Sequence, residues 1–167
     1  MITPEISEKL LQKTDRYLTK IDVNKGASLE KLTTLNQQIL QDIMQLLHDE
    51  LPHYHWVGIY FLKGDTLVLG PYVGPVTQHV RIPVGRGVCG TAVAKNANQI
   101  VSDVRQSTNY LACNIETRSE IVVLVRDPMS SQILGQIDVD GVTVGAFDQS
   151  DEKFLEEVGK RLVKYFI

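Results

Sequence analysis

Positive charge and cysteine are both scarce in this sequence of 167 residues. Lys and Arg number 17 against 20 Asp and Glu, which leaves a formal net charge of -3 and predicts no basic surface for nucleic acid or an anionic membrane. The two cysteines are too few for the disulfide framework of a small secreted domain, so a reducing, cytoplasmic location is expected. No apolar run approaches the roughly 18 residues of a membrane span, and the N-terminus lacks the pattern of a signal peptide.

The length and composition predict one globular domain over residues 1–167. Apolar residues make up 43% of the chain and charged residues 22%, as in ordinary globular proteins. At this length about 70% of the surface of the unfolded chain can be buried on folding. We therefore expect a stable core that needs neither a metal ion nor a disulfide, and we predict no cofactor.

Hydrophobic periodicity divides the chain into three parts. Helical spacing predicts an N-terminal helix pair over 4–50, with helices at 4–22 and 28–50, and a C-terminal helix over 148–165. Between them lies a sheet core over 56–140. This order predicts an α/β (α+β) fold, with an antiparallel sheet of about six strands flanked by helices. The expected elements of the core are strands at 56–62, 66–70, 79–82, 99–104, 120–126 and 132–139, and a small helix at 91–96.

The two cysteines are the first candidates for chemistry. Cys89 lies between glycines near the predicted start of the small helix, where a helix N-terminus can lower a thiol pKa. Cys113 lies in a long polar loop at 106–117, and loops of that length are often functional. A lone cysteine is nevertheless more often a small buried hydrophobe than a reagent, so the thiols alone leave both interpretations open.

Three acidic residues form the second candidate group. Asp138 and Asp140 alternate with apolar residues, so both carboxylates lie on one face of the predicted strand. Unpaired charges are unfavourable in a core, so these side chains either meet solvent at the strand end or line a polar cavity. A solvated strand end is the more common outcome. Glu120 begins the adjacent predicted strand and can face the same space.

An aromatic pair is the third candidate. Trp56 and Tyr60 are four residues apart on one predicted strand, so they share a face. Most aromatic side chains on strands simply belong to the core. A Trp and a Tyr, each with one polar atom, can equally form the wall of a small-molecule pocket.

Two superficial motifs carry little weight. His53 and His55 are spaced like a pair of metal ligands, but no third ligand is spaced to complete a site. Gly85, Gly87 and Gly90 match the spacing of a dinucleotide-binding fingerprint, but the surrounding pattern lacks a parallel βαβ unit. We predict neither a metal site nor a dinucleotide site.

Taken together, several segments resemble one family. Residues 81–92 (RIPVGRGVCGTA) are similar to the signature of free methionine-(R)-sulfoxide reductases, which are single GAF domains. The segments 67–72, 111–113 with 119–122, and 138–140 also fit that family. The resemblance runs from about Trp56 to the C-terminus. It implies a GAF-like fold, usually dimeric, so a homodimer is expected.

The resemblance also implies an activity and its residues. The family reduces the R epimer of free methionine sulfoxide, with thioredoxin or another thiol as the electron donor. Cys113 would be the nucleophile, and Glu120 or Asp140 would protonate the leaving oxygen. The full set implied by the resemblance comprises two thiols, an aromatic pair for the methyl end, and three acids around the oxygen and the ammonium group: Cys113, Cys89, Trp56, Tyr60, Glu120, Asp138 and Asp140.

Position 79 departs from the family pattern. Members usually carry a further cysteine ten residues before Cys89, which closes a disulfide, whereas this chain has His79. Three outcomes remain open. Cys89 pairs with Cys113, or an external thiol reduces the oxidised Cys113 directly, or the protein binds its ligand without turnover. The last outcome corresponds to a non-catalytic GAF module that binds or senses a small ligand.

Overall fold

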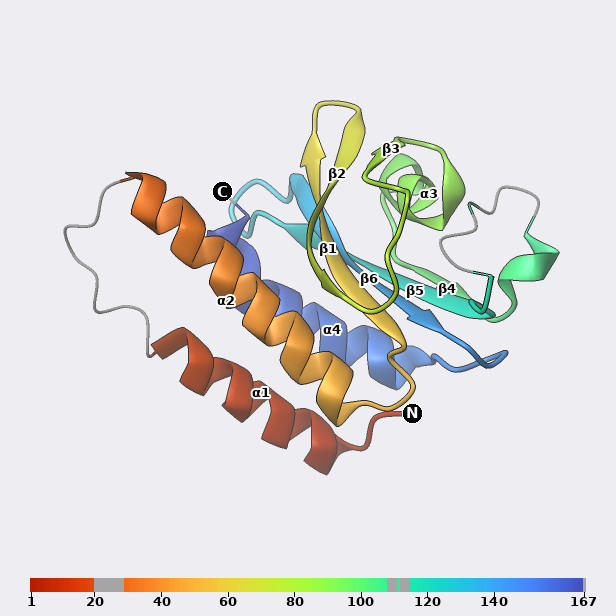
Figure 1. Cartoon of the computed structure of the whole chain (residues 1–167), viewed down its shortest axis with the longest axis horizontal. Helices are drawn as coiled ribbons and strands as arrows, with labels where there is room; N and C mark the ends of the chain where they lie inside the picture. Colours follow the sequence, from red (N-terminus) through yellow and green to blue (C-terminus); the bar gives the residue numbers. More distant parts are fainter. Residues whose placement is uncertain (20–28, 108–110, 112–114, 167) are drawn as a thin grey trace.

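The computed structural model describes residues 1–19, 29–107, 111 and 115–166. Its sheet is antiparallel throughout and has the strand order β3-β2-β1-β6-β5-β4, which confirms the predicted six strands (Figure 1). The strands are β1 (Trp56–Lys63), β2 (Thr66–Val73), β3 (Arg81–Pro83), β4 (Gln99–Val101), β5 (Ser119–Arg126) and β6 (Ile133–Gly141).

The helices cover the two faces of the sheet unequally. Helices α2 and α4 pack against one face, with α1 lying on those two helices, and α3 packs on the other face (Figure 1), which confirms the α+β class. None of the helices in the described ranges combines the length and the apolar character of a membrane-spanning segment. The helices are α1 (Pro4–Thr19), α2 (Leu29–Glu50), α3 (Gly87–Lys95) and α4 (Gln149–Leu162), with short 3-10 turns η1 (Val104–Gln106) and η2 (Val163–Tyr165).

The alternation of side chains along the central strands produces two apolar cores. Val57 and Ile59 of β1 join Ile137 of β6 in the larger core, which is shared with α1, α2 and α4. Trp56 and Tyr60 point the opposite way and join the smaller core beneath α3. Because successive residues of a strand face opposite sides, each strand contributes to both cores at once. The face toward α3 is also the face of the acidic residues.

Strand β2 is longer than the sequence predicts. We expect irregular chain from Gly70 onward, but β2 continues to Val73. The register with β1 shifts between the pairs Gly58–Tyr72 and Tyr60–Leu69, so an extra residue is accommodated in β2. Proline cannot donate a hydrogen bond to a neighbouring strand, and a bulge leaves one residue of the strand unpaired. The bulge therefore allows the Gly-Pro sequence at 70–71 to lie within β2.

Helix α3 begins four residues before its predicted start. It starts at Gly87, and Arg86 at the N-cap makes no side-chain capping hydrogen bond. A sequence without a capping residue and rich in glycine gives no sign of a helix start. The absence of a side chain at Gly90 lets α3 lie against the preceding turn, because a Cβ there would be 2.5 Å from the carbonyl oxygen of Pro83.

Three strand ends also differ from their predicted positions. The strand expected at 79–82 is β3, which starts only at Arg81. The strand expected to reach residue 104 stops at Val101, because Asp103 caps the 3-10 turn that follows. Strand β6 runs on to Gly141, so its two aspartates lie within the strand and not at its end.

Replacement of Gly135 by alanine should destabilise the fold. A Cβ there would overlap the carbonyl oxygen of Tyr60 and come within 2.9 Å of the Phe166 ring, and backbone cannot move aside cheaply. We expect the free energy of unfolding, measured by urea denaturation, to fall by at least about 2 kcal/mol. Gly159→Ala in α4 is the matched control and should change it by no more than about 1 kcal/mol, since its Cβ would lie 3.3 Å from Val125. Equal changes would contradict this assignment.

Candidate active site

Three neighbouring strands bring the predicted acids together. Asp140 of β6 is in register with Glu120 of β5 on one side and with Trp56 of β1 on the other. Asp138 follows on the same face, opposite Gly58. Asp138 and Asp140 are each 1% exposed and Glu120 is 2% exposed. The more common outcome for such aspartates, a solvated strand end, is therefore wrong here.

Hydrogen bonds fasten the chain that enters β5 and leaves β6. The backbone N–H of Arg118 donates to the carbonyl of Gly141, and the Ser119 hydroxyl donates to the carbonyl of Thr143. The segment after β6 is fastened in turn, because Gly145 N–H donates to the carbonyl of Ser102. These contacts join segments distant in sequence, so local patterning does not predict them.

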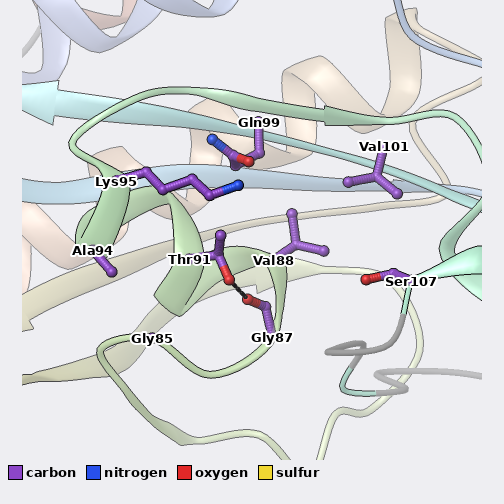
Figure 2. Close-up of a pocket in the computed structure, with 9 residues that line it drawn as sticks. All are labelled: Gly85, Gly87, Val88, Thr91, Ala94, Lys95, Gln99, Val101 and Ser107. Carbon is purple, nitrogen blue, oxygen red and sulfur yellow. Dashed lines mark hydrogen bonds between the residues drawn. The ribbon is translucent and has the colours of Figure 1, made fainter.

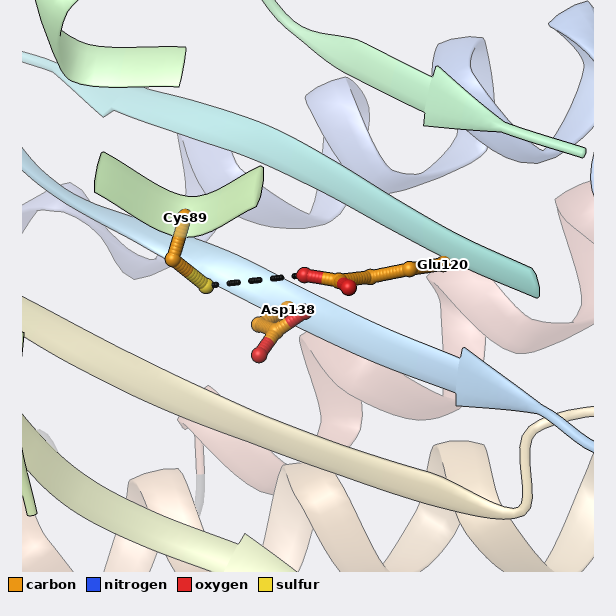
Figure 3. A group of neighbouring side chains, drawn as sticks. All are labelled: Cys89, Glu120 and Asp138. Atoms are coloured by element: carbon orange, nitrogen blue, oxygen red, sulfur yellow. Dashed lines mark hydrogen bonds between the residues drawn. The ribbon is translucent and has the colours of Figure 1, made fainter. Parts of the chain in front are cut away.

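Helix α3 places a thiol on the acids. Cys89 lies in its first turn, as expected, and is 3% exposed. Its Sγ donates to Oε1 of Glu120 at 3.9 Å. Figure 3 shows the thiol and the Glu120 carboxyl group pointing toward each other, with Asp138 beside them. One ligand atom from each of the three residues lies within 4.8 Å of the others, so one small polar group can contact all three.

The burial of these acids changes their protonation. Desolvation, followed by the charges of Asp138 and Asp140, raises the pKa of Glu120 well above its ordinary value. Desolvation also raises the pKa of Asp138 to about 7, against the opposing effects of the Cys89 thiol, Glu120 and the Val139 amide. Desolvation and the charge of Asp138 raise the pKa of Asp140. The cluster therefore holds protons near neutral pH.

An aromatic wall stands beside the acids. The rings of Trp56 and Tyr60 are 6.4 Å apart between centroids, which confirms that they share a face. Tyr72 of β2 stacks on Trp56 at 5.3 Å. The Trp56 ring leans over Gly58, where any side chain would overlap it. The Tyr60 hydroxyl donates to the carbonyl of His79 at 2.8 Å, which fixes the ring against the loop before β3.

Several buried polar atoms of this face make no hydrogen bond within the described part of the chain. Among them are Trp56 Nε1, both carboxyl oxygens of Asp138 and Oδ1 of Asp140. Buried polar groups are normally paired, so these atoms point to a polar ligand. The acids suit a cationic group or a protonated oxygen, and the indole suits an acceptor. A free amino acid carries groups of both kinds.

Sequence reasoning missed three members of this face. In the sequence, Tyr72 stands out only as part of the motif at 67–72, and its stacking on Trp56 is not predicted. The need for glycine at position 58 is evident only from the structure, where the Trp56 ring occupies the space of a side chain. Gln136 is fully buried on β6. The alternation that picks out Asp138 and Asp140 also picks out Gln136 two residues earlier, and that signal was available in the sequence.

The predicted nucleophile, Cys113, lies outside the described residues, so its place relative to the acids stays a prediction. Leu111, two residues before it, is described. Its side chain packs on Gly87, in the first turn of α3, with atoms 3.1 Å from where a Cβ would stand. This contact attaches the chain before Cys113 to the helix that carries Cys89.

The two histidines that are spaced like metal ligands each contact a different carboxylate. Nε2 of His53 lies 2.7 Å from Oδ1 of the buried Asp151 at the start of α4. Nε2 of His55 lies 3.5 Å from Oε2 of Glu116. The two rings thus contact carboxylates from different segments of the chain and do not converge on one site.

A cavity of about 530 Å³ lies on another side of α3 (Figure 2). The Thr91 hydroxyl beside it donates to the Gly87 carbonyl and so is held within the helix. Neither Cys89 nor any acid of the cluster lines this cavity, so the two features are separate. Its walls are formed by Gly85, Gly87, Val88, Thr91, Ala94, Lys95, Gln99, Val101 and Ser107.

Comparison with known proteins shows which family this chain belongs to. No protein-family model matches the chain. The chain is 42% identical over 125 residues to the free methionine-R-sulfoxide reductase of Escherichia coli, which covers 75% of this chain and 74% of that protein.

Solved structures agree with that similarity. The free methionine-R-sulfoxide reductase of Neisseria meningitidis, in complex with its substrate, superposes with a TM-score of 0.81 at 29% identity, over 99% of this chain and 93% of that one. A structure described as a GAF domain superposes with a TM-score of 0.78 at 31% identity, over 96% of this chain and 89% of that one. The fold is therefore a GAF fold.

The buried acids should make the protein less stable as the pH rises. A carboxyl group with a raised pKa keeps its proton in the folded state to a higher pH than in the unfolded state. Its stabilising contribution is complete below the unfolded pKa, near 4, and is lost as the pH rises to about 7 for Asp138. We expect the free energy of unfolding to fall by up to about 4 kcal/mol across this window.

Asp138→Asn should flatten that fall, and urea denaturation at pH 5 and pH 8 measures it. Asp127→Asn is the matched control. The Asp127 carboxylate accepts backbone hydrogen bonds from Ser130 and Met129, which hold its pKa below the ordinary value and outside the window. An unchanged pH dependence in Asp138→Asn would show that Asp138 is not the titrating group.

Proposed function

Because the chain belongs to the free methionine-R-sulfoxide reductase family, we propose that it reduces free L-methionine (R)-sulfoxide to methionine. The observation that carries this proposal is the meeting of one thiol and three buried acids beside an aromatic wall. Sulfoxide reduction requires an acid that protonates the leaving oxygen and an apolar surface for the methyl group, which this face supplies. It also requires a thiol that attacks sulfur, a role that we assign to Cys113.

The proposed chemical step balances as follows. The thiolate of Cys113 attacks the sulfoxide sulfur and the sulfur–oxygen bond breaks. The oxygen takes a proton from Glu120 or Asp140 and is transferred to the cysteine as a sulfenic acid, while the substrate sulfur is reduced to the thioether of methionine. The raised pKa values of Glu120 and Asp140 support this role, since a proton donor must still hold its proton at neutral pH.

The same residues account for a preference for the free amino acid. The acids Asp138 and Asp140 offer unpartnered oxygens, within the described chain, to the ammonium group that a peptide-bound methionine lacks. The rings of Trp56 and Tyr60 receive the methyl and side-chain end. The near-complete burial of this face excludes a protein chain by size.

Turnover then requires a reductant. A second thiol converts the sulfenic acid into a disulfide with release of water, and a dithiol reduces that bond by exchange. We assign the last step to thioredoxin or another thiol reductant, which places the enzyme in a reducing compartment such as the cytoplasm. We further assign a homodimer, on the family resemblance alone.

The direct test is an assay with the two separated epimers and dithiothreitol as the reductant. The protein should consume the R epimer of free methionine sulfoxide and leave the S epimer unchanged. Cys113→Ser should abolish turnover, and Glu120→Gln should lower kcat about 10²- to 10⁴-fold. Glu116→Gln changes an exposed acid and should leave kcat unchanged.

Two results would count against this function. Retained turnover in Cys113→Ser would remove the assigned nucleophile. Tight binding of the sulfoxide by calorimetry, without turnover of either epimer, would favour the alternative of a non-catalytic GAF module that binds or senses a small ligand.

The presence of histidine at position 79 leads to a prediction about how oxidised Cys113 is reduced. Without a third cysteine, only Cys89 is left to pair with Cys113, and Cys89 is buried in α3 with its thiol on Glu120. We expect a Cys89–Cys113 disulfide to form slowly or not at all after one turnover without reductant. Mass spectrometry of the quenched protein measures this, and complete disulfide formation within one turnover would contradict it.

A further inference from the structure

Gln136 is a buried amide that the fold itself does not explain. It is fully buried on β6, two residues before Asp138 and on the same face. It lies in register with Tyr60 of β1 and Leu124 of β5, both members of the apolar core beneath α3. Neither its Nε2 nor its Oε1 has a hydrogen-bond partner among the residues that the structure describes.

An amide in these surroundings is unfavourable for stability. A polar group that leaves water without gaining a hydrogen bond raises the free energy of the folded state. Methionine or leucine would fill similar space without that penalty. Rules of this kind are broken mainly at functional sites, so Gln136 is better explained by a ligand than by packing.

The position of Gln136 limits which part of a ligand it can meet. The strands β1, β5 and β6 present two buried side-chain nitrogens without an acceptor, within the described chain, toward α3: Trp56 Nε1 and Gln136 Nε2. Gln136 lies next to Tyr60, at the alternate position before Asp138. The Glu120 carboxyl group extends from β5 to within 4.8 Å of a carboxyl oxygen of Asp138, so the acid assigned to the leaving oxygen points toward the same part of this face. Gln136 is therefore at the methyl end of the proposed site, and Asp138 lies between it and Asp140.

We propose that Gln136 is a specificity residue whose amide N–H donates to the sulfoxide oxygen of the substrate. The proposal rests on the function proposed above and adds to it a neutral donor at the sulfur end. A carboxylate group carries a full charge, which is poorly accommodated beside Leu124 and the Tyr60 ring, whereas a sulfoxide oxygen is a strong but uncharged acceptor. The hydrogen bond distinguishes the substrate from the product, since the thioether of methionine lacks that oxygen.

This difference between substrate and product makes a sharp test. Gln136→Met and Gln136→Leu remove the amide and keep most of the volume. We expect KM for free methionine (R)-sulfoxide to rise about tenfold or more, and the inhibition constant of methionine to stay within about twofold. We also expect the thermal midpoint to be unchanged or higher. Gln132→Met, at an exposed position in the turn before β6, is the matched control and should change none of these values.

Three results would overturn the proposal. An unchanged KM in both variants would show that the Gln136 amide does not contact the sulfoxide. An equal rise of KM and of the methionine inhibition constant would place the amide on the amino-acid part of the ligand. A lower thermal midpoint in both variants would show that the amide serves the fold.

Binding measurements separate this proposal from the proposed reaction. Calorimetry in a Cys113→Ser background compares the affinities for the sulfoxide and for methionine without turnover. If the wild-type protein fails to reduce the sulfoxide, the proposed function falls, and the preference of Gln136 for the sulfoxide over methionine is still measured. If the wild type is active and Gln136→Met in this background binds the sulfoxide as tightly as its parent does, the inference about Gln136 alone falls.

Discussion

Carboxyl groups that share a space poor in water cannot all be charged at once, and the sheet of this protein brings three of them together. Glu120, Asp138 and Asp140 are held side by side by the ladder hydrogen bonds of β5 and β6 and are closed in by α3. Their mutual repulsion and their loss of hydration keep protons on the cluster near neutral pH. Removal of the sulfoxide oxygen as a hydroxyl group requires a proton, and protonated acids beside the site can supply it.

The sequence predicts most of the fold because period-two alternation is a local signal. The pattern correctly assigns Asp138 and Asp140 to one face, and Trp56 and Tyr60 to one face, as the structure confirms. Whether that face is exposed to water depends on parts of the chain outside the strands. Helix α3 covers it with Val88, Cys89 and Ala92, from a segment distant in sequence from β6. The burial of the acids could therefore not be read from the strand alone.

Other features could not be predicted for equally physical reasons. Helix α3 starts at Gly87 without a capping side chain, and β2 continues through a bulge at a Gly-Pro pair. Both depend on tertiary contacts that override weak local preferences. The role of Cys113 came from a family resemblance and not from spacing, and it remains a prediction because that residue lies outside the described chain.

The alternation of core residues and site residues along the central strands has an evolutionary consequence. In β1, β5 and β6 the odd-numbered positions fill the helix-backed core, and the even-numbered positions face α3. Selection can therefore act on ligand chemistry at alternate positions while the residues between them keep the domain folded. A scaffold of this kind can exchange one small-molecule specificity for another by a few substitutions, which gives a simple physical reason for one sheet architecture to serve enzymes and sensors alike.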